Sequence, residues 1–130
     1  MTVVLVRHAS AGDRDKWDGD DRLRPLDRRG RKCAKALCDR LLELGATRVL
    51  SSPYLRCMQT VEPLGIGIEL DDRLAEGAPR EETLALLADA EGAVACTHGD
   101  VIENVIGWSI EKGAAVVLED AVVVDELAAP

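Results

Sequence analysis

Residues 3–8 read VVLVRH, and this short stretch indicates both the fold and the place of the chemistry. A strand over residues 2–7 that is apolar on both faces is typical of a buried position in a parallel sheet. Such a strand delivers Arg7 and His8 together at its carboxyl end. His98, the other histidine, directly follows a second apolar stretch, VACT. Because ligands of these sheets bind at the carboxyl ends of the strands, the two histidines predict one shared site.

Strand-like and helix-like segments alternate over most of the chain. Apolar residues recur at three- and four-residue spacing from Ala34 to Leu44, which predicts a helix over residues 28–44 with Asp27 as its cap and Gly45 at its end. In chain order, the other expected elements are a polar loop at 9–26, strands at 48–51, 66–70 and 92–97, helices at 53–64, 79–90 and 100–110, and strands at 114–119 and 121–127.

This order of elements predicts the fold class. Alternating strands and helices favour an α/β protein, a three-layer α/β/α sandwich with a mostly parallel sheet of about six strands. The last two strands are expected to form a hairpin, with one antiparallel strand at the sheet edge. Two helix starts carry capping signals, namely Ser52 before Pro53 and the capping-box-like pair Asp100 and Glu103. A chain of 130 residues fits a single domain over residues 1–130.

Composition and charge disfavour several classes of function. Hydrophobic residues make up 47% of the chain but aromatic residues only 2%, so the core is aliphatic and few rings can stack on bases. The net charge of -8 disfavours nucleic-acid binding, because the phosphate backbone attracts basic surfaces. The charge is uneven, since residues 1–56 hold 13 Lys or Arg against 8 Asp or Glu, and residues 57–130 hold 3 against 16. An anion site is therefore expected to draw on the first half.

The cysteines and the N-terminal sequence bear on the cellular compartment of the protein. The spacing of the four cysteines matches no zinc or redox motif, and none is followed six positions later by an arginine, as in cysteine phosphatases. Free thiols favour a reducing environment. The N-terminus lacks the pattern of a signal peptide, and no apolar run approaches the eighteen or so residues that span a bilayer. We therefore expect a cytoplasmic protein without a membrane partner.

Three short motifs carry the residues suited to catalysis. They are RHAS at residues 7–10, SSPYLRCMQT at 51–60 and THGD at 97–100. In this order, and on these expected elements, they resemble the histidine phosphatase superfamily, also called phosphoglycerate mutase-like proteins. The short chain and the segment RLRPLD at 22–27 resemble the small phosphatases of that family, including phosphohistidine phosphatases and the histidine phosphatase domains fused to Nudix hydrolases.

The resemblance implies a metal-independent phosphatase without a cofactor. In that family a histidine nitrogen attacks phosphorus, and water later hydrolyses the phosphohistidine. By its place in the motif His8 is the nucleophile, and Arg7 and Arg56 bind the phosphoryl oxygens, which guanidinium groups contact two at a time. His98 contacts the same oxygens and stabilises the charge of the transition state. The nearby arginines disfavour a metal cation at the two histidines.

An alkoxide leaving group needs a proton from a positioned acid. Glu76, in the segment RLAEG, resembles the acid of the family's phosphatase branch. Asp100 is the rival acid, although its place directly after THG favours a helix cap. One departure from the family pattern is Ala9, which stands where a glycine usually follows the Arg-His pair.

The substrate class and two alternative functions stay open. The substrate is expected to be a small phosphorylated metabolite or a protein that carries phosphohistidine, and the oligomeric state is not predicted. One alternative is a non-catalytic module that binds phosphoryl groups, and a weaker one is a phosphomutase, for whose usual insertions the chain lacks room. A basic cluster is either a solvated helix face or a surface that steers anionic substrates, and it comprises Arg22, Arg24, Arg28, Arg29, Arg31, Lys32 and Lys35.

Overall fold

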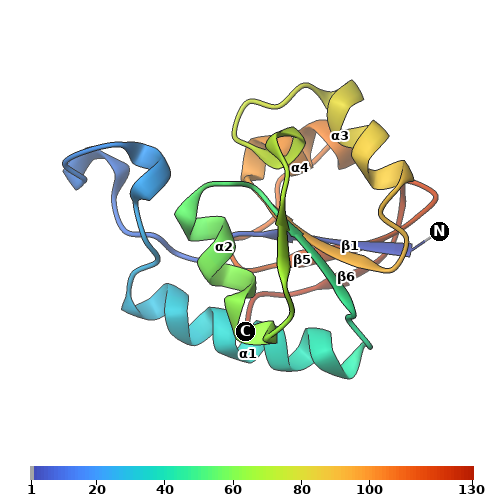
Figure 1. The fold of residues 1–130 in the computed structure, drawn as a ribbon, viewed down its shortest axis with the longest axis horizontal. Coiled ribbons are helices and arrows are strands. Elements are labelled where there is room, and N and C mark those ends of the chain that lie inside the picture. The colour runs from blue at the N-terminus through green and yellow to red at the C-terminus, as the bar shows by residue number, and fades with distance from the viewer. Residues whose placement is uncertain (1) are drawn as a thin grey trace.

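The apolar strand at the start of the chain lies inside the sheet (Figure 1). It is β1 (Thr2–Arg7) of the computed structural model, which describes residues 2–130. The six strands follow the order β3-β2-β4-β1-β5-β6. The other five are β2 (Arg48–Ser51), β3 (Ile68–Leu70), β4 (Ala93–Thr97), β5 (Ala115–Glu119) and β6 (Val122–Leu127).

Strand pairing confirms a mostly parallel sheet with an antiparallel edge. β1 pairs with β4, β4 with β2 and β2 with β3, all in parallel. β5 runs antiparallel to β1, and β6 runs antiparallel to β5. The register sets Arg7 opposite Thr97, and the backbone N–H of His8 donates to the Thr97 carbonyl at 3.1 Å. The segments that carry His8 and His98 therefore leave the sheet side by side.

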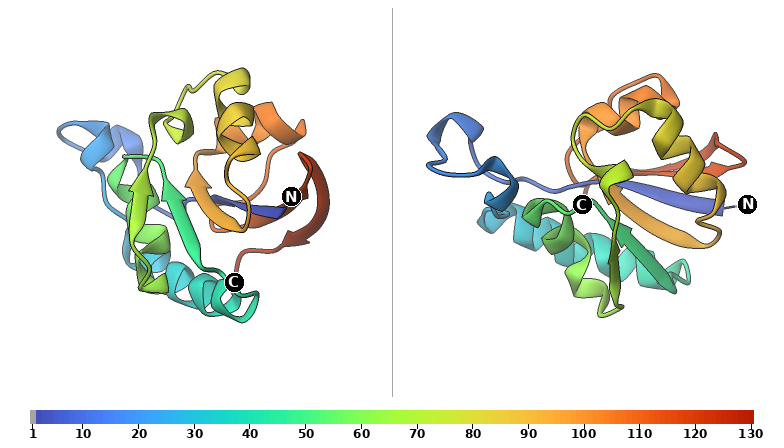
Figure 2. Two further views of the ribbon diagram at one scale, coloured as in Figure 1. Left: turned by 45° about the vertical axis from the view of Figure 1, so that its right-hand side comes forward. Right: turned by 45° about the horizontal axis from the view of Figure 1, so that its top comes forward.

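Helices cover both faces of the sheet and confirm the three layers (Figures 1 and 2). Alternate residues of β1 serve the two cores, because successive side chains of a strand point to opposite faces. The four helices are α1 (Arg28–Glu43), α2 (Leu55–Val61), α3 (Arg80–Ala88) and α4 (Gly99–Ile106). Val6 belongs to the core under α1 and α2, and Leu5 to the core under α3 and α4.

Helix α1 is confirmed with its cap and is tied to the segment that follows His8. The Asp27 carboxylate accepts from the Gly30 N–H at 2.7 Å and from the Ser10 hydroxyl at 2.6 Å. The Asp27 N–H in turn donates to the Ser10 carbonyl at 3.1 Å. The start of α1 thus supports the backbone beside the catalytic candidates. No helix within residues 2–130 has both the length and the apolar sequence that crossing a bilayer requires.

We expect Gly30→Ala to lower the free energy of unfolding by about 3 kcal/mol, at the upper end of overpacking effects. Gly30 is buried, and a Cβ there would overlap the backbone carbonyl of Ser10. Urea unfolding followed by circular dichroism measures the loss. Gly67→Ala is the matched control, because nothing lies within 4 Å of a Cβ at Gly67. A Gly30→Ala variant as stable as this control would contradict the close packing.

The predicted helix start at Ser52 and Pro53 is wrong. Helix α2 begins only at Leu55 and ends at Val61, and its N-cap residue Tyr54 makes no side-chain cap. A single 3-10 turn then covers Glu62–Leu64. The Ser52 hydroxyl accepts from the Tyr54 N–H at 3.2 Å, ahead of the helix, and lies 2.9 Å from Nε2 of His98, so it joins this turn to the site.

The predicted capping pair of the fourth helix is also wrong. Helix α4 begins at Gly99 and has no side-chain cap. The Asp100 carboxylate accepts from the Gly77 N–H at 2.8 Å, and the Glu103 carboxylate accepts from the Ser109 hydroxyl at 3.1 Å. Asp100 therefore anchors the loop that carries Glu76 rather than its own helix.

The polar loop over residues 9–26 projects from the body of the molecule beside α2 (Figure 1). Two 3-10 turns shape it, Arg14–Lys16 and Asp21–Leu23. The side chains of Asp13 and Asp20 cap these turns, because each accepts from a backbone N–H two residues later. The loop is therefore built from local hydrogen bonds that bring Arg14 and Asp21 toward the site.

Candidate active site

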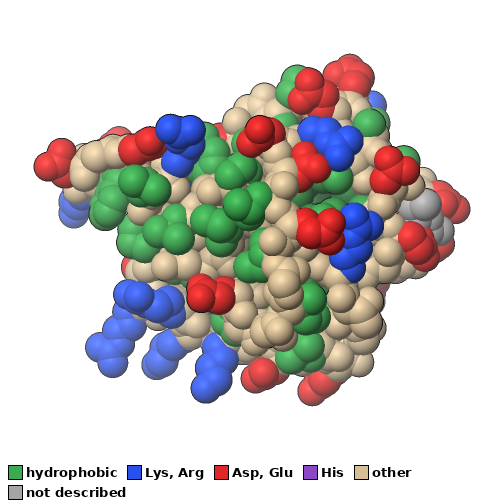
Figure 3. Space-filling view, in the orientation of Figure 1, with side chains coloured by type: hydrophobic (Ala, Val, Ile, Leu, Met, Phe, Trp, Pro, Cys, Tyr) green, Lys and Arg blue, Asp and Glu red, His purple; other side chains and the backbone are tan. Residues whose placement is uncertain are grey.

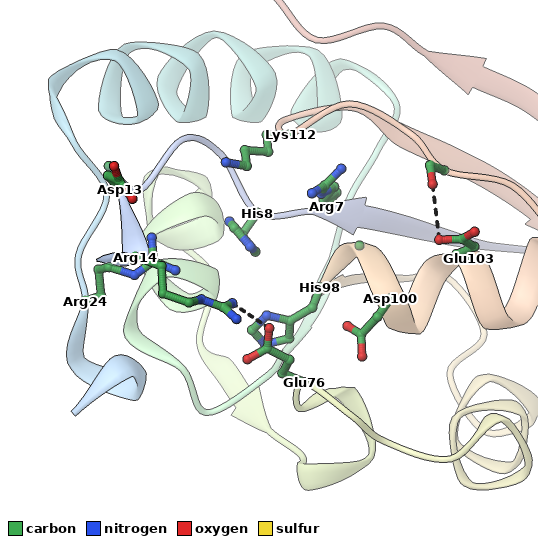
Figure 4. A pocket seen from close by; sticks show the side chains of 13 residues that line it. Arg7, His8, Asp13, Arg14, Arg24, Glu76, His98, Asp100, Glu103 and Lys112 are labelled. Carbon is green, nitrogen blue, oxygen red and sulfur yellow. Dashed lines mark hydrogen bonds and ion pairs between the residues drawn. The ribbon is translucent and has the colours of Figure 1, made fainter. Parts of the chain in front are cut away.

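A pocket of about 600 Å³ opens at the carboxyl ends of β1 and β4 (Figure 4). Arg7 and His8 line it from the end of β1, and His98 lines it from the end of β4. Glu76 lines it from the loop before α3. The structure thus brings together four of the five predicted site residues. The pocket is completed by Gly12, Asp13, Arg14, Arg24, Gly99, Asp100, Glu103, Ser109 and Lys112.

A backbone contact sets the tautomer of His8. Its Nδ1 lies 2.8 Å from the carbonyl oxygen of Ala9. Because a carbonyl oxygen only accepts, Nδ1 carries the proton and Nε2 keeps its lone pair. This is the arrangement that a nucleophilic imidazole needs.

The surroundings of His8 keep the ring neutral. Its pKa is lowered from 6.5 to about 3, chiefly because burial penalises the charged form. The positive charges of Arg56 and Arg7 and the electrostatic influence of the neighbouring His98 lower the pKa as well, while the hydrogen bond to Ala9 opposes the shift. His8 is 7% exposed, so a lone pair is available on a ring that is shielded from bulk water.

The lowered pKa of His8 makes stability fall in acid. Between pH 6.5 and 3 the unfolded chain binds a proton at this residue that the folded chain does not, so the free energy of unfolding decreases as the pH falls. From pH 7 to pH 5 we expect the wild type to lose about 2 kcal/mol more than His8→Gln. Urea unfolding of both proteins at the two pH values measures the difference. Equal losses would contradict a buried neutral His8.

His98 presents one free nitrogen to the pocket. Its Nε2 lies 2.9 Å from the Ser52 hydroxyl and 3.5 Å from the Cys57 sulfur. Within residues 2–130 its Nδ1 is buried and has no hydrogen-bond partner. When the Ser52 hydroxyl donates to Nε2, Nδ1 carries the proton and can donate to a phosphoryl oxygen. The His8 and His98 rings meet edge to face, with centroids 5.4 Å apart.

Arg7 is held between two backbone segments. Its Nη1 donates to the carbonyl of Ile110 at 2.6 Å. On another side its guanidinium lies against the start of α4, where a Cβ on Gly99 would come within 2.8 Å of Cζ. Glycine at this position therefore permits the close approach. Nε of Arg7 has no partner among the described residues, so donors of the fork are available to a ligand.

Arg56 does not line the pocket. Its side chain is 0% exposed, and its guanidinium lies 4.9 Å from the centre of the Tyr54 ring. Nη1 donates to the Asp21 carbonyl at 2.8 Å, and Nη2 donates to the Asp21 carboxylate at 3.0 Å. Nη2 also lies 3.5 Å from Glu76. Arg56 thus places a buried positive charge beside the pocket, and Asp21 is a partner that the sequence did not reveal.

Both candidate acids line the pocket. The Glu76 carboxylate accepts from Nη2 of Arg14 at 2.6 Å, as the dashed line in Figure 4 marks. Glu76 keeps 31% of its side chain exposed, so a leaving group can reach it. Asp100 points toward the same pocket from α4, while its carboxylate also holds the Gly77 N–H (Figure 4).

Sequence reasoning missed Arg14 and Lys112 as pocket residues. Arg14 lies in a polar loop whose conformation the sequence does not predict, and its link to Glu76 spans 62 positions. Lys112 could have been singled out from the sequence, because it is the last of the four lysines and stands in the acidic half of the chain. Arg24, which the RLRPLD segment contains, also lines the pocket and donates to the Ala11 carbonyl at 2.6 Å.

The departure from the family pattern at Ala9 leaves the pocket intact. Ala9 is fully buried in a small cluster with Ala11, Leu26 and Ala34. Its N–H donates to the Thr60 hydroxyl at 3.0 Å. The extra methyl group therefore packs into the protein and takes no room from a ligand. Within residues 2–130, no three His, Cys, Asp or Glu side chains are grouped as metal ligands would be.

A model of the histidine phosphatase superfamily (branch 1) matches residues 3–81 of the chain. Over 125 aligned residues the chain is 39% identical to an 8-oxo-(d)GTP phosphatase of Mycolicibacterium smegmatis. The match covers 85% of this chain but 38% of that protein, which is therefore much longer.

Solved structures share the fold over nearly the whole chain. The protein histidine phosphatase SixA complexed with tungstate superimposes with a TM-score of 0.80 at 21% identity, covering 98% of this chain and 97% of that one. A putative phosphohistidine phosphatase SixA from Agrobacterium tumefaciens has a TM-score of 0.79 at 25% identity, with the same coverage. These likenesses confirm the predicted α/β fold.

Proposed function

The chain belongs to the histidine phosphatase superfamily, and on that premise we propose that it hydrolyses a phosphate ester or a phosphohistidine through a covalent intermediate on His8. The observation that carries the proposal is the contact of 2.8 Å between Nδ1 of His8 and the Ala9 carbonyl. It leaves the lone pair on Nε2 of a ring whose pKa lies near 3. An imidazole in this state attacks phosphorus without first losing a proton.

In the first step the bond between Nε2 of His8 and phosphorus forms as the bond to the leaving group breaks. Glu76 acts as the general acid that supplies a proton to the leaving atom as this bond breaks. Arg7 and Nδ1 of His98 donate to the phosphoryl oxygens and stabilise the charge of the transition state. In this scheme Arg56 contributes positive charge beside the pocket, and it contacts the phosphoryl group once Nη2 exchanges Asp21 for phosphate oxygens.

In the second step water hydrolyses the intermediate. The Glu76 carboxylate takes a proton from the water, whose oxygen attacks phosphorus. The bond between phosphorus and Nε2 breaks, so phosphate leaves and His8 recovers its lone pair. Chelation of metal ions is expected to leave the rate unchanged, because in this scheme every catalytic group is a side chain of the protein.

The relatives support two substrate classes. One is named a phosphatase of an oxidised nucleotide, and the SixA proteins are named phosphatases of phosphohistidine. A small phosphorylated metabolite and a phosphohistidine protein are both compatible with a pocket of about 600 Å³. The four free cysteines support a reducing compartment such as the cytoplasm.

A screen for free phosphate release tests the proposed function. Metabolites and phosphohistidine peptides are incubated with the wild type in the presence of a chelator, with His8→Ala as the blank. We expect release from at least one compound by the wild type alone. Saturable phosphate or vanadate binding without release would instead favour a non-catalytic module, and movement of label between positions of the substrate would favour a mutase.

Substitution of Glu76 is expected to depend on the leaving group. Glu76→Gln should lower kcat for an alkyl phosphate by about 10²-fold, since the alkoxide needs a proton. The loss for p-nitrophenyl phosphate should be less than about tenfold, because nitrophenolate leaves without one. Asp100→Asn is the matched control within the same pocket. If Asp100→Asn shows the stronger dependence on the leaving group, Glu76 is not the acid.

A further inference from the structure

A second pocket adjoins the active site and shares one wall with it. Its volume is about 680 Å³, and Ser10, Arg29 and Lys32 contribute to its lining. Lys112 lines both this pocket and the active-site pocket. The two pockets therefore meet at a single cationic side chain, which Figure 4 shows above His8 and below α1.

The shared wall is held firmly against both His8 and α1. The Gly113 N–H donates to the carbonyls of Arg7 and His8 at 3.0 and 3.2 Å. Gly113 has a φ of +82°, and a Cβ there would overlap the Cys33 sulfur of α1. Backbone hydrogen bonds and close packing thus fix the segment that carries Lys112. A ligand that extends beyond His8 on this side meets Lys112 first and the side chains of α1 next.

The cations of the second pocket lack internal partners. Arg29, Lys32 and Lys112 are exposed, and among residues 2–130 none of them forms an ion pair. Arginines elsewhere on the surface do pair, as Arg48 with Glu69 and Arg73 with Asp71, both at 2.9 Å. Against these three cations the lining holds one acidic side chain, Glu111, so the side chains that line the pocket carry a net positive charge.

The surface around the second pocket is also rich in positively charged side chains. Figure 3 shows Lys and Arg side chains projecting along the edge of the molecule that α1 forms. The whole chain has a net charge of -8, so a concentration of unpaired cations beside the active site is not a consequence of composition. No aromatic side chain lines the second pocket, which favours recognition of charge over stacking on a base.

We propose that the second pocket is a subsite for a second phosphoryl group of the substrate. The reacting phosphoryl group lies at His8, Lys112 lies between the two groups, and Arg29 with Lys32 bind the distal one. Guanidinium and ammonium groups both bind phosphate oxygens, the first as a fork and the second as a point charge. The substrate class is a small molecule with two or more phosphoryl groups. The assignment rests on the proposed function of His8 for the identity of the reacting end.

Inhibition by inorganic anions tests the subsite. Orthophosphate offers a single phosphoryl group, whereas tripolyphosphate offers further phosphoryl groups that can extend past Lys112 from the active-site pocket. We expect tripolyphosphate to inhibit p-nitrophenyl phosphate hydrolysis at a concentration about tenfold lower than orthophosphate, at fixed ionic strength. Arg29→Gln/Lys32→Gln should reduce this advantage to about threefold or less. Equal inhibition of the wild type by the two anions would overturn the proposal.

A matched variant separates a built subsite from general electrostatic attraction. Arg31→Gln/Lys35→Gln removes the same charge from the same helix, but Arg31 and Lys35 line a different pocket. The advantage of tripolyphosphate should persist in this control, and an equal loss in both double variants would refute the subsite. Titration calorimetry with both anions measures binding independently of turnover. A chain that binds tripolyphosphate better but hydrolyses nothing would refute the proposed function and leave the subsite standing.

Discussion

Replacement of His8 by alanine is expected to lower kcat/KM for p-nitrophenyl phosphate by at least about 10⁴-fold. The substitution removes the atom to which phosphorus is transferred, so both steps of the proposed reaction are lost. Positioned donors and binding alone sustain only the residual rate. Phosphate release in the presence of a chelator measures the effect.

The stability of the His8→Ala variant must be checked separately. The ring is buried, so its removal leaves a cavity beside Arg7 and His98. His98→Asn serves as the matched control, because it changes the other pocket histidine without removing the nucleophile. We expect this control to lose about 10²-fold and to remain measurable. A folded His8→Ala variant with activity near the wild-type level would exclude the proposed intermediate.

Arg7→Lys is expected to lower kcat/KM by about 10²-fold, although the positive charge is kept. A lysine has no planar fork with which to hold the Ile110 carbonyl and a phosphoryl oxygen together; the guanidinium of Arg7 holds that carbonyl, and we propose that it also contacts the phosphoryl group. The loss should appear mainly in kcat, because the second donor matters most when charge develops on the phosphoryl oxygens. Steady-state kinetics with p-nitrophenyl phosphate separates kcat from KM.

The matched control for Arg7 is Arg73→Lys. Arg73 is a surface arginine that pairs with Asp71 and lies outside the pocket lining. This control should keep its activity within about twofold, in line with the small effect of an exposed ion pair. If the activity of Arg7→Lys also stays within twofold of the wild type, the proposed forked contact of Arg7 with the phosphoryl group is wrong.

Much of the fold could be predicted because local pattern and tertiary structure agree. The apolar run before Arg7 needs no partner information to indicate a buried strand, and the spacing from Ala34 to Leu44 indicates α1 directly. Parallel strands then bring His8 and His98 to one edge of the sheet. The shared site followed from these elements alone.

The predictions that were wrong concern polar side chains whose partners lie far away in the sequence. Ser52 and Asp100 have the propensity of helix caps, but one contacts His98 and the other the loop of Glu76. The contact between Arg56 and Asp21 of the polar loop was likewise not predicted from local pattern. Hydrogen bonds between segments tens of residues apart leave no periodic signal in the sequence, so local pattern could not reveal them.

The proposed reaction passes through a phosphoryl group bound to His8, and this intermediate can be trapped directly. The wild type is mixed with p-nitrophenyl phosphate, quenched within its first turnovers and digested, and the peptide that contains His8 is analysed by mass spectrometry. We expect one added phosphoryl group on that peptide, stable in base and labile in acid, and absent from His8→Ala. Phosphate release by an active wild type with no phosphoryl group on His8 at any quench time would contradict it.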